Sequence, residues 1–371
     1  MEAMSTSGMS LDHALMIIAG EGAQQVGVYL RKVFRAPLEV FLKAGIHDPV
    51  TIHDRYVEAR LQYLLGSAVP SSRILGEETG EHVLDKEKVA GAGSITLEQI
   101  QRASLDQSRR QGSKQILIDE FAWEQAQPSQ RKEAVGAAEL AQAEETAKNL
   151  GSRVRWIVDP IDGTANFAAG IPYFNTSIGV ELDGKPVAGV IYVPYTRELF
   201  IADAHKAILY EGERATSMCA KSARVENEGI ITGYFPFRDK DPQRVEKSWQ
   251  LAGKLANAYA TVHSPGAGAL DLAHVAAGHT AVAFGTAMRP WDVAAGIHLV
   301  RVAGGQVHAY ETARNREDPE HLRGAFVASA RDLDPLTARA AVEHFLRAFK
   351  REGRGGVEDE TRGKQKLRSF Y

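Results

Sequence analysis

The sequence predicts a mixed α/β fold, and three observations support this prediction. Apolar residues recur at helical spacing over Leu11–Phe34 and Tyr56–Leu65, although small residues interrupt the first run. Two apolar runs, Asn175–Leu182 and Pro186–Val193, flank a short turn that begins at Asp183, a pattern typical of a β-hairpin. Strand-like and helix-like runs then alternate as far as residue 349. A chain of 371 residues can form one large domain or two smaller ones around a substantial core.

The elements of the N-terminal half lead to acidic residues. Residues 48–54 predict a turn or a short extended piece. Asp54 then lies near the N-terminus of the helix that contains Tyr56–Leu65, where a carboxylate is favoured. Residues 73–76 lead into Glu77 and Glu78. A later apolar run, Trp156–Val158, is interpreted as the end of a buried strand.

Residues 79–153 are less clearly patterned, and we interpret them as an inserted helical segment outside the core. Thr96–Gln99 has the pattern of a capping box, which predicts a helix continuing to about Arg110. Residues 116–121 form a short apolar piece, and residues 131–150 are rich in Ala, Glu and Gln. The second composition favours a solvent-exposed helix.

The C-terminal half alternates strands with helices. Strands are predicted at residues 198–202, 207–210, 229–233, 281–284, 306–310 and 325–329, and helices at 245–258, 268–277, 291–302 and 334–349. Gly304 and Gly305 are typical of a helix stop. We expect an N-terminal α+β half over residues 1–190 and a C-terminal α/β half over 191–349, with the junction near 185–195. Residues 350–371 are charged and Gly-rich, which predicts a disordered tail.

Composition excludes several classes of protein. A net charge of −3 gives no overall field that would favour nucleic acid or an anionic membrane. The single cysteine, Cys219, excludes an intrachain disulfide and a cysteine-rich zinc site, and we expect it to be a small buried residue. No apolar run approaches the ~20 residues of a membrane span. Residues 1–10 lack the layout of a signal peptide, so we expect a cytoplasmic protein.

The most informative stretch is residues 156–167, in which a buried strand ends in two acids. We expect Asp159 and Asp162 to lie on the turn that leaves the strand. Gly163 permits a conformation or close approach that a side chain would block, and Thr164 could begin a helix whose free amides face the acids. This arrangement suits a divalent cation together with a phosphate group. An ordinary Asp-Gly and Asp-Pro turn explains the same residues equally well.

Three more acidic positions change the balance between these two readings. Asp54, the pair Glu77 and Glu78, and Asp292 each stand at the end of a predicted element. Singly, each could be a helix cap or a solvated strand end. Together they supply the oxygen ligands that a hard cation requires, and two neighbouring metals could share a carboxylate. Because no histidine or cysteine cluster competes, the predicted metal is Mg²⁺ rather than Zn²⁺.

These positions resemble the signature motifs of the inositol monophosphatase family. The matching segments are Gly76–Glu78, Asp159–Phe167 and Trp291–Gly296, with Asp48–Asp54 and Lys43 upstream. The resemblance covers residues 11–345 apart from the 79–153 segment. It implies an α/β (α+β layered) fold, a sugar-phosphatase-type αβαβα sandwich with an inserted helical segment. Members are often homodimers, and the resemblance extends this expectation to the present chain.

The resemblance also implies a site for two or three Mg²⁺ ions. Glu77 would bind the first metal, and Asp159 would bridge two metals. Ile161 would contribute its backbone carbonyl, while Asp162 and Asp292 would hold the second metal. Asp292 is also expected to contact the substrate.

The remaining implied roles concern water and phosphate. Thr164 would pair with Asp54 to orient and activate the attacking water beside Glu77, giving direct in-line attack without a covalent intermediate. The amides of Gly163 and Thr164 would receive the phosphate group. Lys43 would help position metal and phosphate, or it is a solvated surface lysine.

One departure from the family pattern concerns the substrate. Inositol-specific members carry an acid several residues before the Trp-Asp motif, and by spacing that position is Gly285 here. No acid lies between His279 and Asp292. The pair His274 and His279 is expected to be structural. Gly266–Asp271 resembles a helix start beside the substrate, or it serves close helix packing.

The predicted function is Mg²⁺-dependent hydrolysis of a phosphate monoester of a small polyol, sugar or related metabolite. Alternative enzymes are a 3′(2′),5′-bisphosphate nucleotidase, a fructose-1,6-bisphosphatase and a histidinol-phosphate phosphatase. Arg238 or Arg289 near a second phosphate would favour a bisphosphate, because guanidinium suits phosphate geometry. An alternative of another class is a non-catalytic interaction protein on the same fold.

Overall fold

The computed structural model describes residues 8–36, 40–42, 49–100, 102, 136–233, 242–312 and 315–352. The helices are α1 (Leu11–Val33), α2 (Ile52–Ala68), α3 (Lys86–Ser94), α5 (Ala137–Ala147), α6 (Thr164–Ala169), α7 (Pro242–Ala258), α8 (Gly268–Ala276), α9 (Pro290–Val302) and α10 (Leu336–Glu352). The first strands are β1 (Val40–Leu42), β2 (Pro49–Thr51), β3 (Arg73–Gly76), β4 (Gly80–Val83), β5 (Val154–Asp162), β6 (Asn175–Leu182), β7 (Lys185–Val193) and β8 (Glu198–Ala202). The later strands are β9 (Ala207–Glu211), β10 (Arg214–Ser217), β11 (Ile230–Gly233), β12 (Thr261–His263), β13 (Val282–Met288), β14 (Gln306–Ala309) and β15 (Gly324–Ser329).

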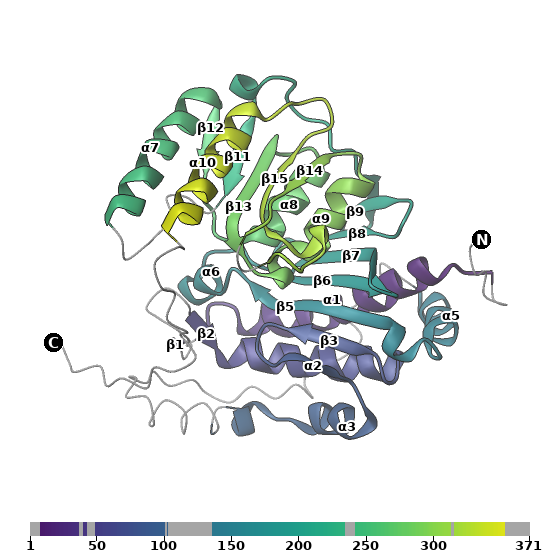
Figure 1. Ribbon diagram of the computed structural model, residues 1–371. Helices are drawn as coiled ribbons and strands as arrows, with labels where there is room; N and C mark the ends of the chain where they lie inside the picture. The colour runs from purple at the N-terminus through teal and green to yellow at the C-terminus, as the bar shows by residue number, and fades with distance from the viewer. Residues whose placement is uncertain are drawn as a thin grey trace.

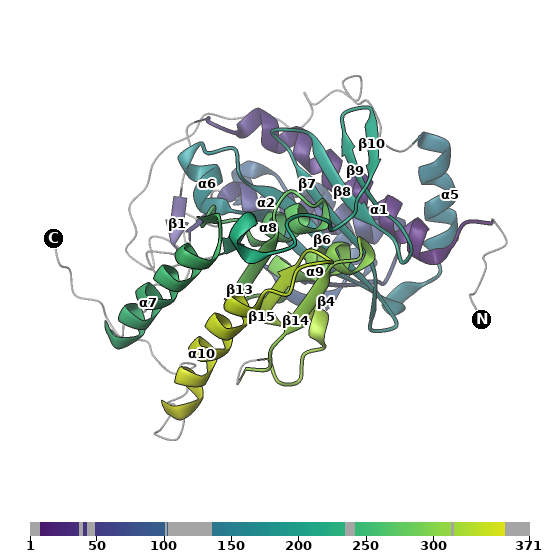
Figure 2. The ribbon, with the colours of Figure 1, turned by 90° about the horizontal axis from the view of Figure 1, so that it is seen from above.

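Two large sheets alternate with three helical layers, as Figures 1 and 2 show. One sheet has eight strands in the order β10-β9-β8-β7-β6-β5-β3-β4, and the other has five in the order β12-β11-β13-β15-β14. Helices α1 and α2 cover the outer face of the larger sheet, α8 and α9 lie between the sheets, and α7 and α10 cover the smaller sheet. The predicted αβαβα sandwich is therefore confirmed.

The apolar pattern of the sequence explains the layers. Leu30 of α1, Leu61 of α2 and Trp156 of β5 are fully buried in one cluster between the first helical layer and the larger sheet. Leu272 of α8 and Ile297 of α9 belong to a second cluster between the sheets. Each such side chain contributes roughly 1.5–3 kcal/mol by leaving water. Burial along α1 explains why it continues through its glycines as one helix.

Helix α9 lies unusually close to the larger sheet, and this matters for the site. A Cβ atom at Gly179 of β6 would lie 2.7 Å from the Cβ of Ala294. A Cβ atom at Gly189 of β7 would lie 2.7 Å from the carbonyl oxygen of Ala295. The two glycines thus let the helix backbone reach the strands. The N-terminus of α9, with Asp292, is brought toward β5 as a result.

The 79–153 segment is not wholly outside the core, so the prediction is wrong at both of its ends. Strand β4 pairs with β3 at the edge of the larger sheet. Leu84, Ala147 and Leu150 are buried in the cluster beneath α1 and α2. The apolar residues of this segment are too widely spaced to form a helical or strand pattern, so the sequence did not predict that they are buried. The capping box at Thr96 is present, with the Gln99 N–H 3.2 Å from the Thr96 hydroxyl.

Two other segment predictions change in detail. Residue 190 lies within β7, and β8–β10 continue the same sheet, so the smaller sheet begins only with β11. The junction near 185–195 stays a prediction. Helix α10 extends through Glu352, so residues 350–352 are helical rather than part of a tail. The predicted elements at 103–110 and 116–121, and the tail at 353–371, lie outside the described residues.

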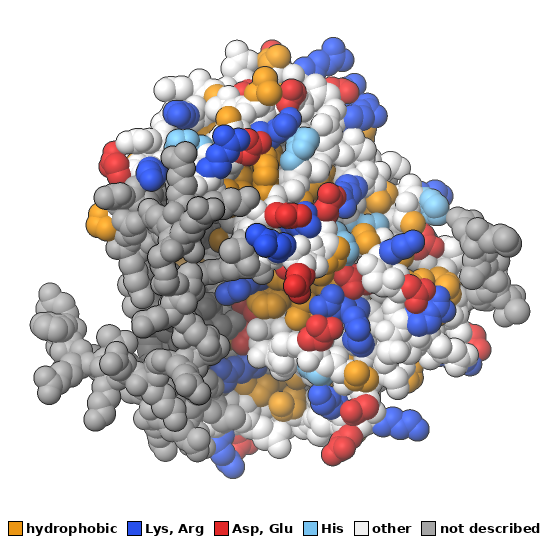
Figure 3. All heavy atoms as spheres, viewed as in Figure 1, with side chains coloured by type: hydrophobic (Ala, Val, Ile, Leu, Met, Phe, Trp, Pro, Cys, Tyr) orange, Lys and Arg blue, Asp and Glu red, His pale blue; other side chains and the backbone are white. Residues whose placement is uncertain are grey.

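The surface agrees with the balanced composition. Figure 3 shows acidic and basic side chains interspersed on the face that it presents. Cys219 is exposed, contrary to the prediction that it is buried, whereas Met218 and Ala220 on either side of it are buried. Among the helices in the described ranges, none combines the length and the apolar character that a membrane crossing requires.

Candidate functional site

Strand β5 carries the central acids. Asp159 and Asp162 lie within the strand, not on the turn after it, because β5 continues pairing with β6 through Asp162. The register shifts between these two acids, so the strand is irregular where they occur. Thr164 begins α6 as predicted, and Gly163 before it has a φ of 89°. The sequence predicted either a conformation or a close approach that needs glycine, and both are present, since an added Cβ would lie 2.9 Å from the carbonyl oxygen of Tyr173.

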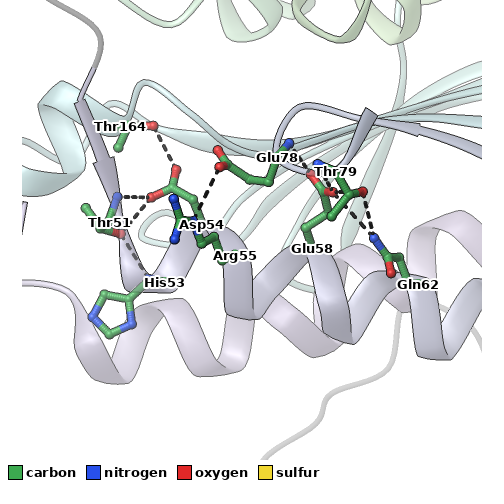
Figure 4. Close-up of polar contacts among 9 residues, drawn as sticks. All are labelled: Thr51, His53, Asp54, Arg55, Glu58, Gln62, Glu78, Thr79 and Thr164. Atoms are coloured by element: carbon green, nitrogen blue, oxygen red, sulfur yellow. Dashed lines mark hydrogen bonds and ion pairs between the residues drawn. The ribbon is translucent and has the colours of Figure 1, made fainter. Parts of the chain in front are cut away.

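Asp54 joins the start of α2 to the start of α6. Its Oδ2 atom accepts hydrogen bonds from the Thr51 N–H at 2.7 Å and the Thr51 hydroxyl at 2.6 Å. Its Oδ1 atom lies 2.9 Å from the Thr164 hydroxyl, as Figure 4 shows. The carboxylate is therefore both a helix-capping group and a partner of Thr164. The two readings of Asp54 from the sequence are compatible.

The Thr164 hydroxyl has a second acceptor within reach. It lies 2.9 Å from the carbonyl oxygen of Ile161 as well as 2.9 Å from Asp54. A hydroxyl carries one proton and so donates fully to one of these oxygens at a time. Its own lone pairs remain able to accept a hydrogen bond, for example from a water molecule.

Asp162 connects β5 to the N-terminus of α8. Its Oδ1 atom accepts from the Gly268 N–H at 3.1 Å, and its Oδ2 atom accepts from the Ala269 N–H at 2.9 Å. The Asn175 side-chain amide donates to Oδ2 at 2.7 Å. A helix N-terminus favours a negative charge. The Gly266–Asp271 segment thus holds an acid of the site, a role that was not among the two predicted for it, a helix start beside the substrate and close helix packing.

Glu77 and Asp292 approach Asp159 from two further elements. Glu77 follows β3, and its N–H donates to the carbonyl of Val158 at 3.2 Å. Asp292 lies in the first turn of α9, where its Oδ2 atom accepts from the Arg289 N–H at 2.8 Å. Both acids lie close enough to Asp159 for their charges to raise its pKa. The structure therefore brings together four predicted acids from three separate parts of the sequence.

Burial and mutual repulsion raise the pKa values of these acids. Burial is the main cause for Asp159, and the charges of Glu77, Asp162 and Asp292 hold its pKa further above the usual range. Burial and the charge of Asp162 raise the pKa of Asp292 to about 7. Burial raises the pKa of Asp162 to about 6, although hydrogen bonds from Asn175 and α8 oppose this. Burial and the charge of Glu78 raise the pKa of Asp54 to about 7.

The donor chemistry of this cluster fits Mg²⁺, because it consists of carboxylates with a carbonyl nearby. Repulsion among buried carboxylates is what a divalent cation would relieve. Within the described ranges, however, no group of three or more acidic, histidine or cysteine side chains is arranged so that it could hold a metal ion. The ligand assignments of Glu77, Asp159, Ile161, Asp162 and Asp292 therefore stay predictions.

The other predicted residues have varied places. Lys43 and Arg238 lie outside the described residues. Glu78 is nearly buried, with one carboxylate oxygen 4.0 Å from Nε of Arg55. His274 and His279 contact each other, their Nδ1 atoms 3.1 Å apart. Burial lowers the pKa of His274 to about 4, which is consistent with the predicted structural role.

Sequence reasoning missed two polar side chains that support the site. Asn175 opens β6 and holds Asp162. Glu58 is fully buried on α2, where it contacts the turn after β3. Its position four residues after Asp54, on the same face of the helix, was the available signal.

The fold and the acid cluster together define a known class. The chain matches the inositol monophosphatase family over residues 12–346. This match covers most of the chain, and the protein therefore belongs to the inositol monophosphatase family.

Individual relatives agree with this assignment. Nus factor SuhB of Escherichia coli K12 is 39% identical over 162 residues, which cover 44% of this chain and 59% of that protein. An inositol-1-monophosphatase of Caulobacter vibrioides is 35% identical over 184 residues, covering 48% of this chain and 68% of its own. The matched stretch thus spans less than two thirds of the SuhB relative.

Solved structures show the same fold. The extragenic suppressor protein suhB of Bartonella henselae superposes with a TM-score of 0.59 at 26% identity, covering 90% of this chain and 98% of its own. An IMPase of Thermotoga maritima superposes with a TM-score of 0.58 at 18% identity, and the superposition covers 90% of this chain and 97% of that structure. The second likeness concerns the fold alone. Family membership supports a phosphatase-type function.

Proposed function

We propose that the protein hydrolyses a phosphate monoester of a small polyol, sugar or related metabolite, using Mg²⁺. The observation that carries this proposal is the hydrogen bond between Thr164 and Asp54 beside the four clustered acids. A proton acceptor, a hydroxyl and acids of the type that bind Mg²⁺ are the parts that metal-assisted hydrolysis by water requires. Family membership adds independent support.

The residues of the chain divide the work. The Thr164 oxygen accepts a hydrogen bond from the attacking water and orients it. As the water attacks, its proton passes to the Thr164 oxygen while the Thr164 proton passes to Asp54. The left-handed Gly163 allows the backbone to turn, so that the first amides of α6 face a phosphate group. Asp159, Asp162, Asp292 and Glu77 would hold the metal ions, with the Ile161 carbonyl. When bound, Mg²⁺ neutralises phosphate charge and lowers the pKa of water.

The substrate is the finer part of the proposal. Gly285 stands where inositol-specific relatives of the family carry an acid, which argues for another polyol or sugar phosphate. A Cβ atom at Gly285 would lie 2.8 Å from the Phe326 ring and 2.9 Å from the sulfur of Met288. This position is therefore filled by packing. Arg289 contacts Asp292 through its backbone, which does not by itself favour a bisphosphate.

A phosphate-release assay tests the proposed function. Inositol, sugar, histidinol and nucleotide phosphates are each incubated with the full chain, in Mg²⁺ and in chelator. We expect Mg²⁺-dependent release from a sugar or polyol phosphate. Release from none of them would overturn the phosphatase proposal. Because relatives named Nus factor SuhB match this chain, that result would favour the alternative of a non-catalytic interaction protein.

A further inference from the structure

One face of α2 carries three polar side chains that point toward the site. Asp54, Glu58 and Gln62 are spaced by four residues and so lie above one another on the helix. Figure 4 shows the first beside Thr164 and the other two beside the turn that follows β3. The proposed function uses only Asp54, and the role of the other two is open.

Glu58 binds the backbone of the turn after Glu77. Its Oε2 atom accepts from the Glu78 N–H at 2.8 Å, and its Oε1 atom accepts from the Thr79 N–H at 3.0 Å. Its Oε1 atom also accepts from the Thr79 hydroxyl at 2.5 Å. Gln62 donates to that hydroxyl at 3.0 Å. Both carboxyl oxygens of Glu58 are thus engaged by the turn, which holds the turn against α2.

The residue before Glu77 is pressed against the same carboxylate. A Cβ atom at Gly76 would lie 2.5 Å from Cδ of Glu58, so only glycine allows this approach. The backbone is thus fixed to α2 on both sides of Glu77. Glu77 itself donates its N–H to Val158 of β5. These contacts determine where the Glu77 side chain leaves the backbone.

We propose that Glu58 is a positioning residue for metal binding, which holds the Glu77–Thr79 turn so that the Glu77 carboxylate faces Asp159. This inference rests on the proposed function, because it assigns Glu58 a part in assembling the same site. Both carboxyl oxygens of Glu58 are engaged by the turn, so we do not assign Glu58 as a metal ligand. It acts through the backbone of the turn, and Glu58 and Asp54 are held in fixed relation by one rigid helix. Groups that orient metal ligands in this way typically contribute ~10–100-fold in affinity.

The test compares Mg²⁺ affinity, measured by isothermal titration calorimetry on the full chain, with phosphate release as a second readout. In Glu58→Gln, an NH₂ group replaces one acceptor oxygen and faces donors. We expect Mg²⁺ binding ~10-fold or more weaker, and a matching rise in the Mg²⁺ concentration that half-saturates turnover. Turnover at saturating Mg²⁺ should stay within about threefold of wild type, since bound metal restores the ligand geometry.

The matched control is Glu181→Gln. Glu181 is another buried glutamate, bonded to His321 at 2.7 Å and to Arg155 at 3.3 Å and not to residues of the Glu77–Thr79 turn. We expect it to lower the melting temperature without changing Mg²⁺ affinity. If Glu58→Gln does not fold, Thr79→Val removes one donor to Glu58 at an exposed position and should weaken Mg²⁺ binding ~3-fold.

Three outcomes would overturn the inference. A folded Glu58→Gln variant with wild-type Mg²⁺ affinity would do so while leaving the proposed function intact. If Glu181→Gln weakens Mg²⁺ binding as much as Glu58→Gln does, the inference is also wrong, because the loss of affinity would then reflect general destabilisation. A wild-type protein that binds no Mg²⁺ would instead remove the proposed function, and this inference with it.

Discussion

The hydroxyl of Thr164 lies 2.9 Å from Oδ1 of Asp54, although 110 residues separate them in the sequence. The helix cap that Thr51 and Asp54 form fixes one partner. The left-handed turn at Gly163 fixes the other. Two ordinary local motifs thus meet at the point where the proposed reaction needs a proton acceptor.

Thr164→Val should abolish most turnover without unfolding the protein. The valine has nearly the same shape but cannot pass a proton to Asp54 or orient water, and general base catalysis contributes ~10²–10⁴-fold. We expect the turnover number to fall at least ~100-fold while Mg²⁺ affinity stays within about threefold. The measurement is steady-state phosphate release together with calorimetry. Thr164→Ser keeps the hydroxyl and serves as the control; near-wild-type turnover by the valine variant would refute the pairing.

Gly163→Ala should destabilise the protein and impair phosphate binding. The residue has a φ of 89°, and an added Cβ would lie 2.9 Å from the carbonyl oxygen of Tyr173. Strain of this kind costs ~1–3 kcal/mol. Thermal unfolding should show a lower melting temperature, and inorganic phosphate should inhibit the variant less strongly than wild type. Gly184→Ala is a useful control, since Gly184 also has positive φ but has open space around it. Equal phosphate inhibition of Gly163→Ala and wild type would contradict the role of this turn.

Gly285→Asp should not create an inositol phosphatase. The site for its Cβ is occupied by Phe326, Met288 and the carbonyl of Gly324. We therefore expect overpacking that costs ~1–3 kcal/mol, with no gain in the rate of inositol phosphate hydrolysis. The melting temperature measures the loss of stability, and phosphate release from inositol phosphate measures the rate. A stable variant that gains such activity would show that the pocket adapts more readily than this packing allows.

The stabilisation given by Mg²⁺ should increase with pH. In the metal-free protein, burial and the charge of Glu78 raise the pKa of Asp54 to about 7, and burial and the charge of Asp162 raise that of Asp292 to about 7. A carboxyl group whose pKa is higher in the folded state than in the unfolded state contributes to the free energy of unfolding. This contribution is fully present below about pH 4 and is lost as the pH rises through about 7. The repulsion that then appears is relieved by a cation, so the Mg²⁺-induced rise in melting temperature should grow between about pH 5 and pH 8.

Buried histidines change the stability with pH in the opposite direction, and comparing melting temperatures with and without Mg²⁺ removes their effect. Burial lowers the pKa values of His53 and His274 to about 4, so these groups destabilise the fold as pH falls below about 6.5. Their contribution is the same in both samples and cancels in the difference. A Mg²⁺ effect that is largest at acid pH would contradict the assignment of a carboxylate site.

The sequence predicted the elements that periodicity and turn chemistry control. The hairpin of β6 and β7, the helix after Gly163 and the acids at element ends were all recognisable. It placed Asp159 and Asp162 on a turn because Pro160 and Gly163 are turn residues. In the structure, tertiary pairing with β6 keeps this irregular stretch in the sheet. Local preference was therefore overridden by a long-range contact.

The supporting contacts were not predictable in the same way. Leu84 and Leu150 are isolated apolar residues in polar surroundings, and only the folded chain shows that they join the core beneath α1. The sequence alone suggests that Glu58 lies on the surface of a helix, but in the fold the turn after β3 packs against it. Such contacts depend on which elements meet, which one sequence does not specify.

We propose above all that Asp159 anchors a catalytic Mg²⁺ site. The most direct test is phosphate release by wild type and Asp159→Asn across a Mg²⁺ titration, with Asp183→Asn as a control on the exposed hairpin turn. We predict Mg²⁺-dependent release by wild type and by the control, and loss of at least ~100-fold in Asp159→Asn at every Mg²⁺ concentration. Wild-type release that is unaffected by a chelator, or near-normal turnover by Asp159→Asn, would contradict it.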